Sequence, residues 1–69
     1  GVSSGAILPL EAILGSLENR YDARMIDADL DERRGRMVYD LELLTRDGRV
    51  LEIRVDAATA RVLSFEVDD

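Results

Sequence analysis

The chain has 69 residues, with 9 basic and 15 acidic side chains and a formal net charge of −6. This length fits one small domain, and the acidity disfavours binding to nucleic acid or to anionic lipid surfaces. His and Cys are absent and every basic residue is Arg, so the common zinc, copper and iron ligands and most nucleophile–base pairs are missing. We therefore expect no cofactor, no metal site and no enzymatic activity.

The beginning of the chain divides into a tail and a helix. Residues 1–8 start with Gly-Val-Ser-Ser-Gly, a composition typical of a flexible tail, whereas residues 9–69 carry the patterns of a folded domain. Pro9 suits a first helical turn. Gly15, in the middle of the predicted helix, favours close packing against a sheet. The apolar stripe of this helix recurs at i, i+3, i+4 and i+7 and consists of Leu10, Ile13, Leu14 and Leu17.

After Tyr21 the apolar residues alternate with period two, which indicates four strands separated by short turns. Glu32–Gly35 is a polar turn, Asp47-Gly48 is a strong hairpin signal, and the carboxylate of Asp56 can accept backbone N–H bonds in a third turn. The side chains predicted to face inward are Ile26, Ala28 and Leu30; Met37, Tyr39, Leu41 and Leu43; Leu51, Ile53 and Val55; and Leu63, Phe65 and Val67.

These elements define an α+β fold. Consecutive strands with short connections form a four-stranded antiparallel meander, and one N-terminal amphipathic helix supplies the second layer over its apolar face.

The order of the motifs resembles the PepSY domain family over about Leu10 to Val67. The resemblance is carried by the helix opening Leu10-Glu11-Ala12-Ile13, by Val38-Tyr39-Asp40-Leu41, by Asp47-Gly48, and by the closing run from Val55-Asp56-Ala57-Ala58-Thr59-Ala60 to Leu63. It makes Tyr39, Asp47, Gly48, Asp56, Thr59 and Ala60 the turn and structural motif positions. The family usually has Gly where this chain has Ala60, and a left-handed Ala would cost about 1 kcal/mol or more.

The resemblance also implies a role. PepSY-like segments occur in propeptides of thermolysin-type metallopeptidases and in exported bacterial proteins, so it implies a periplasmic or secreted protein-binding module that inhibits or regulates a peptidase. No signal segment opens the chain, and we expect this sequence to be the mature form or a trimmed one. The alternative is a small sensory or ligand-binding module that modulates an envelope signalling or metal-dependent process.

The second face of the predicted sheet is the candidate partner-binding surface. Polar and apolar side chains are interspersed there, and a solvated face and a docking surface are both compatible with this pattern. The open edges of the sheet could pair with a partner peptide or with a second copy, which leaves a monomer or a weak homodimer as alternatives. The predicted partner-binding residues are Val38, Asp40, Glu42, Glu52, Arg54, Val62 and Ser64.

Asp27, Asp29 and Asp31 form an Asp-x-Asp-x-Asp run that raises the question of a calcium site. The calcium loop pattern requires Gly at its sixth position and Glu at its twelfth. Counted from Asp27, these positions hold Glu32 and Val38. On a strand the three carboxylates share one face without closing around an ion, so a solvated strand face is the prediction and a weak divalent-ion site the alternative.

Overall fold

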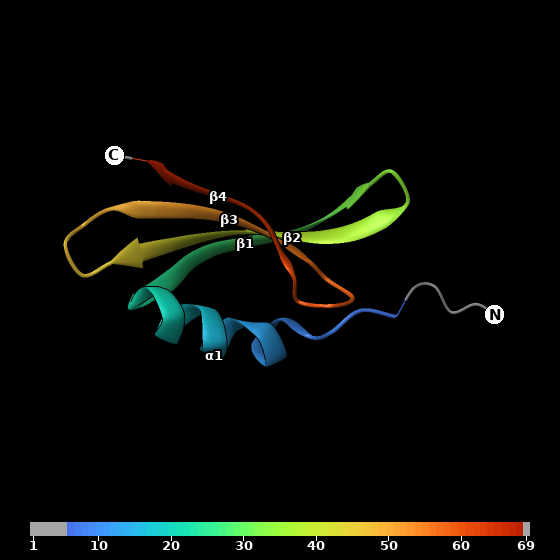
Figure 1. Cartoon of the computed structure of the whole chain (residues 1–69), viewed down its shortest axis with the longest axis horizontal. Coiled ribbons are helices and arrows are strands. Elements are labelled where there is room, and N and C mark those ends of the chain that lie inside the picture. Colours follow the sequence, from blue (N-terminus) through green and yellow to red (C-terminus); the bar gives the residue numbers. More distant parts are fainter. Residues whose placement is uncertain (1–5, 69) are drawn as a thin grey trace.

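The fold is a helix followed by an antiparallel sheet, and a computed structural model describes residues 6–68 of it (Figure 1). The strands pair in sequence order, each antiparallel to the next, and the helix lies along one side of the sheet. The predicted two-layer α+β meander is confirmed. Its elements are α1 (Leu10–Tyr21), β1 (Ala23–Arg33), β2 (Arg36–Thr45), β3 (Val50–Asp56) and β4 (Val62–Asp68).

Helix α1 contributes two fully buried side chains to the interior. Ile13 and Leu17 lie one turn apart on the same face, whereas Leu10 and Leu14 of the predicted stripe are only half-buried. Pro9 occupies the N-cap position. The close packing predicted at Gly15 is wrong, because this residue is exposed and a Cβ built on it would have no atom within 4 Å.

The predicted tight turns are confirmed, and each uses the left-handed backbone conformation. Arg34 and Gly35 have φ values of 53° and 78° and join β1 to β2 in a two-residue hairpin. In the next hairpin Gly48 has φ 90°, and its N–H donates to the carbonyl of Thr45 at 3.1 Å. Glycine adopts this conformation without the Cβ clash that other residues incur.

A bulge in β1 changes which of its side chains face the helix. The register of β1 against β2 shifts between Met25 and Asp27, which leaves Ile26 without a partner. Ala28 packs against the core as predicted, and Met25 does so in place of Ile26. The predicted inward position of Ile26 is wrong because this side chain is 50% exposed. Leu30 is also 45% exposed, since the β1–β2 hairpin extends past the helix (Figure 1).

A second bulge interrupts the start of β4. Val62 pairs with Val55 and Ser64 pairs with Arg54, so Leu63 is the extra residue between them. The alternation predicted for this strand is therefore wrong at two positions. Val62 packs against the core, whereas Leu63 is exposed. Beyond the bulge the predicted alternation is regained, but the inward-row residues Phe65 and Val67 are 46% and 43% exposed because β4 lies at the edge of the sheet.

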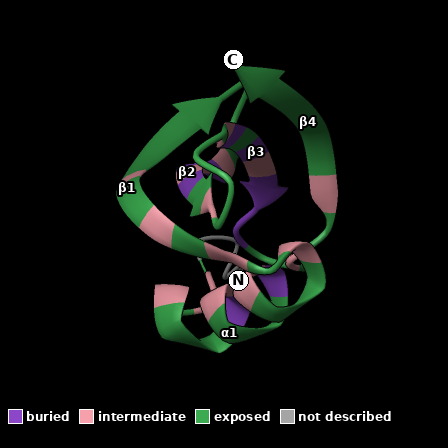
Figure 2. Cartoon of the chain, turned by 90° about the vertical axis from the view of Figure 1, so that its left-hand side faces the viewer, coloured by how far each residue is buried: buried purple, intermediate pink, exposed green. Residues whose placement is uncertain are grey.

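The hydrophobic core lies between α1 and the two central strands, as the buried positions in Figure 2 indicate. The segment before the helix is attached to this core: Ile7 and Leu8 pack against it, the Tyr39 hydroxyl donates to the Leu8 carbonyl at 2.8 Å, and the Leu8 N–H donates to the Ala57 carbonyl at 2.8 Å. The predicted tail of residues 1–8 thus includes two core contacts, and residues 1–5 lie outside the described residues. The core residues are Ile13, Leu17, Tyr39, Leu41, Leu43, Leu51, Ile53, Val55 and Ala57.

Asp56 organises the turn between β3 and β4, as predicted. Its carboxylate accepts the N–H groups of Ala58 at 2.8 Å and Thr59 at 3.3 Å, and it forms an ion pair with Arg36 at 3.6 Å. Such hydrogen bonds satisfy a carboxylate that is only 7% exposed. Ala60 closes the turn with φ 68°, the left-handed conformation that Gly would adopt without strain.

The two faces of β2 can be compared at adjacent leucines. Leu43 has no exposed surface, whereas Leu44 points to the other face and is 40% exposed. We expect Leu43→Ala to reduce the free energy of unfolding by about 2 to 5 kcal/mol, because it removes buried methyl groups and leaves a cavity. Leu44→Ala should cost less than about 1 kcal/mol. Urea unfolding of both variants provides the measurement, and equal losses would contradict the assignment of the core to the helix side.

The strained turn offers a stabilising substitution. Ala60→Gly should raise the free energy of unfolding by roughly 0.5 to 1 kcal/mol, because relief of the left-handed Ala exceeds the added entropy of the unfolded chain. Ala58 belongs to the same turn, but its φ is not positive. Ala58→Gly is therefore the matched control and should lower the free energy of unfolding. Thermal unfolding of both variants would test this, and a lower midpoint for Ala60→Gly would refute it.

Candidate functional site

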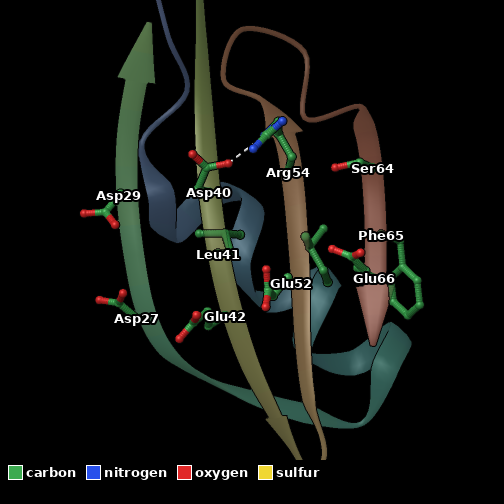
Figure 3. A pocket seen from close by; sticks show the side chains of 11 residues that line it. Asp27, Asp29, Asp40, Leu41, Glu42, Glu52, Arg54, Ser64, Phe65 and Glu66 are labelled. Carbon is green, nitrogen blue, oxygen red and sulfur yellow. Dashed lines mark hydrogen bonds and ion pairs between the residues drawn. The ribbon is translucent and has the colours of Figure 1, made fainter. Parts of the chain in front are cut away.

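The side of the sheet opposite α1, here called the open face, brings carboxylates from all four strands into one row. In the register, Asp27 lies opposite Glu42, Glu42 opposite Glu52, and Glu52 opposite Glu66. Directly opposed side chains on one face of an antiparallel pair have Cβ atoms about 5 Å apart, and like charges at this spacing repel. The row therefore concentrates negative charge across the full width of the sheet (Figure 3).

A second row runs beside the first and contains a cation, Arg54. It places Asp29, Asp40, Arg54 and Ser64 opposite one another in strand order. The Arg54 Nε donates to Asp40 Oδ1 at 2.7 Å, and both side chains are about one-third exposed. This hydrogen bond, the charge of Asp40 and the charge of Asp31 raise the pKa of Arg54 above its ordinary value. The guanidinium of Arg54 is thus already paired with a carboxylate of the adjacent strand.

The two rows line a shallow hollow of about 410 Å³. Among the described residues its walls carry six carboxylates and one guanidinium, which is a formal charge of −5. A concave surface of one charge sign focuses the electrostatic potential and attracts groups of opposite charge. Its charged and polar lining residues are Asp27, Asp29, Asp40, Glu42, Glu52, Arg54, Ser64 and Glu66.

Glu52 sits at the centre of this charge. Partial loss of hydration and then the negative charges of Asp68, Glu66 and Glu42 raise the pKa of its carboxyl above the ordinary 4.5. The direction agrees with the register, which places Glu42 and Glu66 on either side of it. Ionisation of Glu52 is therefore opposed by its neighbours in the free protein.

Five of the seven predicted partner-binding residues line the hollow of the open face, and two do not. Val38 is 2% exposed, in a strand paired on both sides and next to the buried Asp56 turn, so it is not accessible to a partner. Val62 lies on the helix side because of the bulge at Leu63. Both predictions are wrong for these physical reasons. The residues that remain together are Asp40, Glu42, Glu52, Arg54 and Ser64.

The sequence prediction did not assign Asp27, Asp29 and Glu66 to the site. The alternation of polar and apolar residues identifies each of them as a polar position of a strand. The meander order places β1 and β4 on opposite sides of the central pair of strands. Only the register between strands decides that these carboxylates line up with those of the central strands.

The three aspartates of β1 do not act as one group. Asp27 and Asp29 line the hollow, whereas Asp31 accepts the Glu32 N–H at 2.9 Å and forms an ion pair with Arg33 at 3.5 Å. In the part of the chain that the structure describes, no three acidic side chains come together in a geometry suited to a metal ion.

Comparisons with known proteins found no relative: no family model, no curated protein and no solved structure matches the chain. The likeness to PepSY domains therefore stays a prediction from the sequence motifs. Within residues 6–68, no helix has the length and apolar character that a membrane span requires.

The raised pKa of Glu52 predicts a pH-dependent stability. The folded-state pKa of Glu52 exceeds the unfolded one. Protonated Glu52 therefore contributes fully to the free energy of unfolding below the ordinary pKa of 4.5, and this contribution is lost as the pH rises through the folded-state pKa. Glu52→Gln should therefore raise the urea midpoint at pH 7, and the gain should disappear near pH 3.5.

Glu11→Gln is the matched control for this experiment, since Glu11 is exposed in the first turn of α1, where a negative charge is favourable. This substitution should leave the midpoint at pH 7 unchanged or slightly lower. A gain from Glu52→Gln that persists undiminished at low pH would show that charge repulsion is not its cause.

Proposed function

We propose that this chain is a non-enzymatic protein-binding module of the bacterial cell envelope, periplasmic or secreted, that inhibits or regulates a peptidase. The open face is the surface that meets the partner. The peptidase and the location come from the resemblance of Val38–Leu41, Asp47-Gly48 and Val55–Leu63 to PepSY motifs. The manner of binding comes from the geometry of the sheet.

One observation carries the proposal: the side of the sheet opposite α1 has no second layer over it within the described residues, and its centre has a formal charge of −5. Antiparallel sheets commonly leave one face to solvent, and charges of both signs interspersed suit such a solvated surface. Here the carboxylate row repels itself, so a basic surface of a partner would relieve the repulsion as it binds. Complementary charge of this kind speeds association and selects among partners.

The acidic groups favour binding over catalysis, because most of them are either exposed to solvent or already paired. General acid–base chemistry needs a carboxyl that has an adjusted pKa and is also held in place against a bound substrate. On the open face Glu52 and Glu66 are exposed, and Asp40 is held by Arg54. The most buried carboxylate, Asp56, is occupied by two backbone N–H groups and by Arg36. These features support a surface that recognises charge.

Inhibition of peptidases tests the proposal directly. The purified chain is assayed against a panel of secreted thermolysin-type metallopeptidases with a fluorogenic peptide substrate, and we expect inhibition of at least one. The double variant Glu42→Arg/Glu52→Arg should weaken that inhibition by about tenfold or more, and added salt should weaken the wild-type effect, because the contact depends on exposed charges.

The control variant is Glu11→Arg/Glu32→Arg, which changes the net charge equally at exposed positions of α1 and the first hairpin. It should inhibit as the unmodified chain does. Equal loss in both double variants would mean that net charge alone matters and would contradict a role of the open face. Unchanged activity of every peptidase in the panel would contradict peptidase regulation itself.

A further inference from the structure

The outer edge of β4 is a second surface with a definite chemistry. β4 is the last strand of the sheet, and from Ser64 to Asp68 its register against β3 is uninterrupted. In an antiparallel edge strand every second residue directs its N–H and C=O away from the neighbouring strand. This stretch therefore presents a regular ladder of backbone donors and acceptors to which another strand can be added.

The helix-facing side of this edge is apolar and incompletely covered. Phe65 and Val67 are 46% and 43% exposed, and the Phe65 ring stacks on Tyr21 with 5.1 Å between centroids. With Leu51 these side chains line a groove of about 400 Å³. Contiguous exposed apolar surface of this kind is typical of a binding site, because covering it removes apolar area from water.

The polar end of the groove is already neutral. Arg46 forms an ion pair with Asp22 at 3.2 Å, and Arg49 forms one with Asp47 at 3.5 Å. The groove thus has little net charge to offer, and apolar side chains fit it best.

The opposite side of the same edge is acidic. Ser64, Glu66 and Asp68 alternate with the two apolar residues and extend the open face to its border. After partial loss of hydration, the charges of Asp68, Glu66 and Glu42 raise the pKa of Glu52. An added strand would place its polar side chains beside this acidic row, where cations are favoured.

The other edge of the sheet is less suited to pairing. At its end beside α1, the bulge at Ile26 interrupts the ladder of β1 and the N–H of Met25 is donated to the Glu18 carboxylate at 2.8 Å. The rest of β1 pairs without interruption, but its polar row there carries Asp27, Asp29 and Asp31, and Leu30 is the large apolar side chain of its other row. Bulges and covered backbone groups are the means by which natural sheets block their edges.

We infer that the β4 edge of this chain binds, as an added antiparallel or parallel strand, an extended segment of a partner protein whose side chains alternate between apolar and basic. The apolar side chains enter the groove beside Phe65 and Val67, and the basic ones face Glu66 and Asp68. This inference rests on the proposed binding function and names the partner chemistry. A second copy of the chain is disfavoured as the occupant, because each copy has a net charge of −6 and would place carboxylates where cations are required.

A synthetic peptide tests the inference. The probe is an acetylated and amidated peptide of about seven residues in which Arg and Val alternate, titrated into the ¹⁵N-labelled chain and followed by NMR. We expect saturable binding with the largest amide shifts in Ser64–Asp68. Two N-methylated versions of the probe, blocked at alternate amides, should differ in affinity by about tenfold or more, because only every second amide of an added strand faces the edge.

Protein variants locate the charge contribution. Glu66→Arg should weaken binding of the probe by about tenfold at low salt, whereas Glu32→Arg, an equal charge change in the exposed first hairpin, should have little effect. The two variants share a net charge, so a difference between them reports the position of the charge. Equal weakening by both would overturn the inference, since it would leave only non-specific attraction to an acidic chain.

Other outcomes also decide the matter. Equal affinity of the two N-methylated peptides, absence of binding, or shifts confined to Asp27–Asp29 and Asp40–Glu42 would each overturn strand addition at β4. The last result would leave the proposed open-face function intact. Conversely, register-dependent binding at β4 without inhibition of any peptidase would support the edge site and contradict peptidase regulation. A free chain that is dimeric in sedimentation, with amide shifts on dilution centred on Ser64–Asp68, would also overturn it, because the edge would already be occupied.

Discussion

The structure depends on one constraint: within residues 6–68, one helix of 12 residues must cover a sheet of four strands. Only Ile13 and Leu17 of α1 are fully buried, and they pack over the central strands. A chain of this length has few apolar side chains with which to offset the entropy of folding, so those in the middle of the sheet are used completely. Leu43 and Val55 accordingly have no exposed surface.

The limited width of the helix explains where the available surfaces lie. On the edge strands, some side chains that face the helix side lie beyond the area that the helix covers. They stay about half exposed, as Leu30, Phe65 and Val67 show. The opposite side of the sheet has no second layer among the described residues and collects the carboxylates. The open face and the β4 edge are thus both exposed because the helix covers only the middle of one side of the sheet. The two surfaces meet at Glu66. A partner could contact both at once.

Much of this fold follows from local patterns in the sequence. The helix follows from the spacing of Ile13 and Leu17, the second hairpin from Asp47-Gly48, and the third turn from the Asp56 carboxylate, since each rests on contacts within a few residues. The bulges at Ile26 and Leu63 could not be predicted in this way. Alternation assumes an uninterrupted register, and one extra residue reverses the faces of the side chains on one side of it.

By itself, therefore, the sequence determined the order of the elements, the identity of the central core and the acidic character of the surface. These depend on residue type and short-range spacing. The tertiary structure decided that Val38 is buried and Val62 faces the helix. It also decided that Asp27, Glu42, Glu52 and Glu66 form one row and that, among the described residues, no strand pairs with the outer edge of β4. These depend on the register between strands and on the reach of the helix, which are set by contacts between segments distant in the sequence.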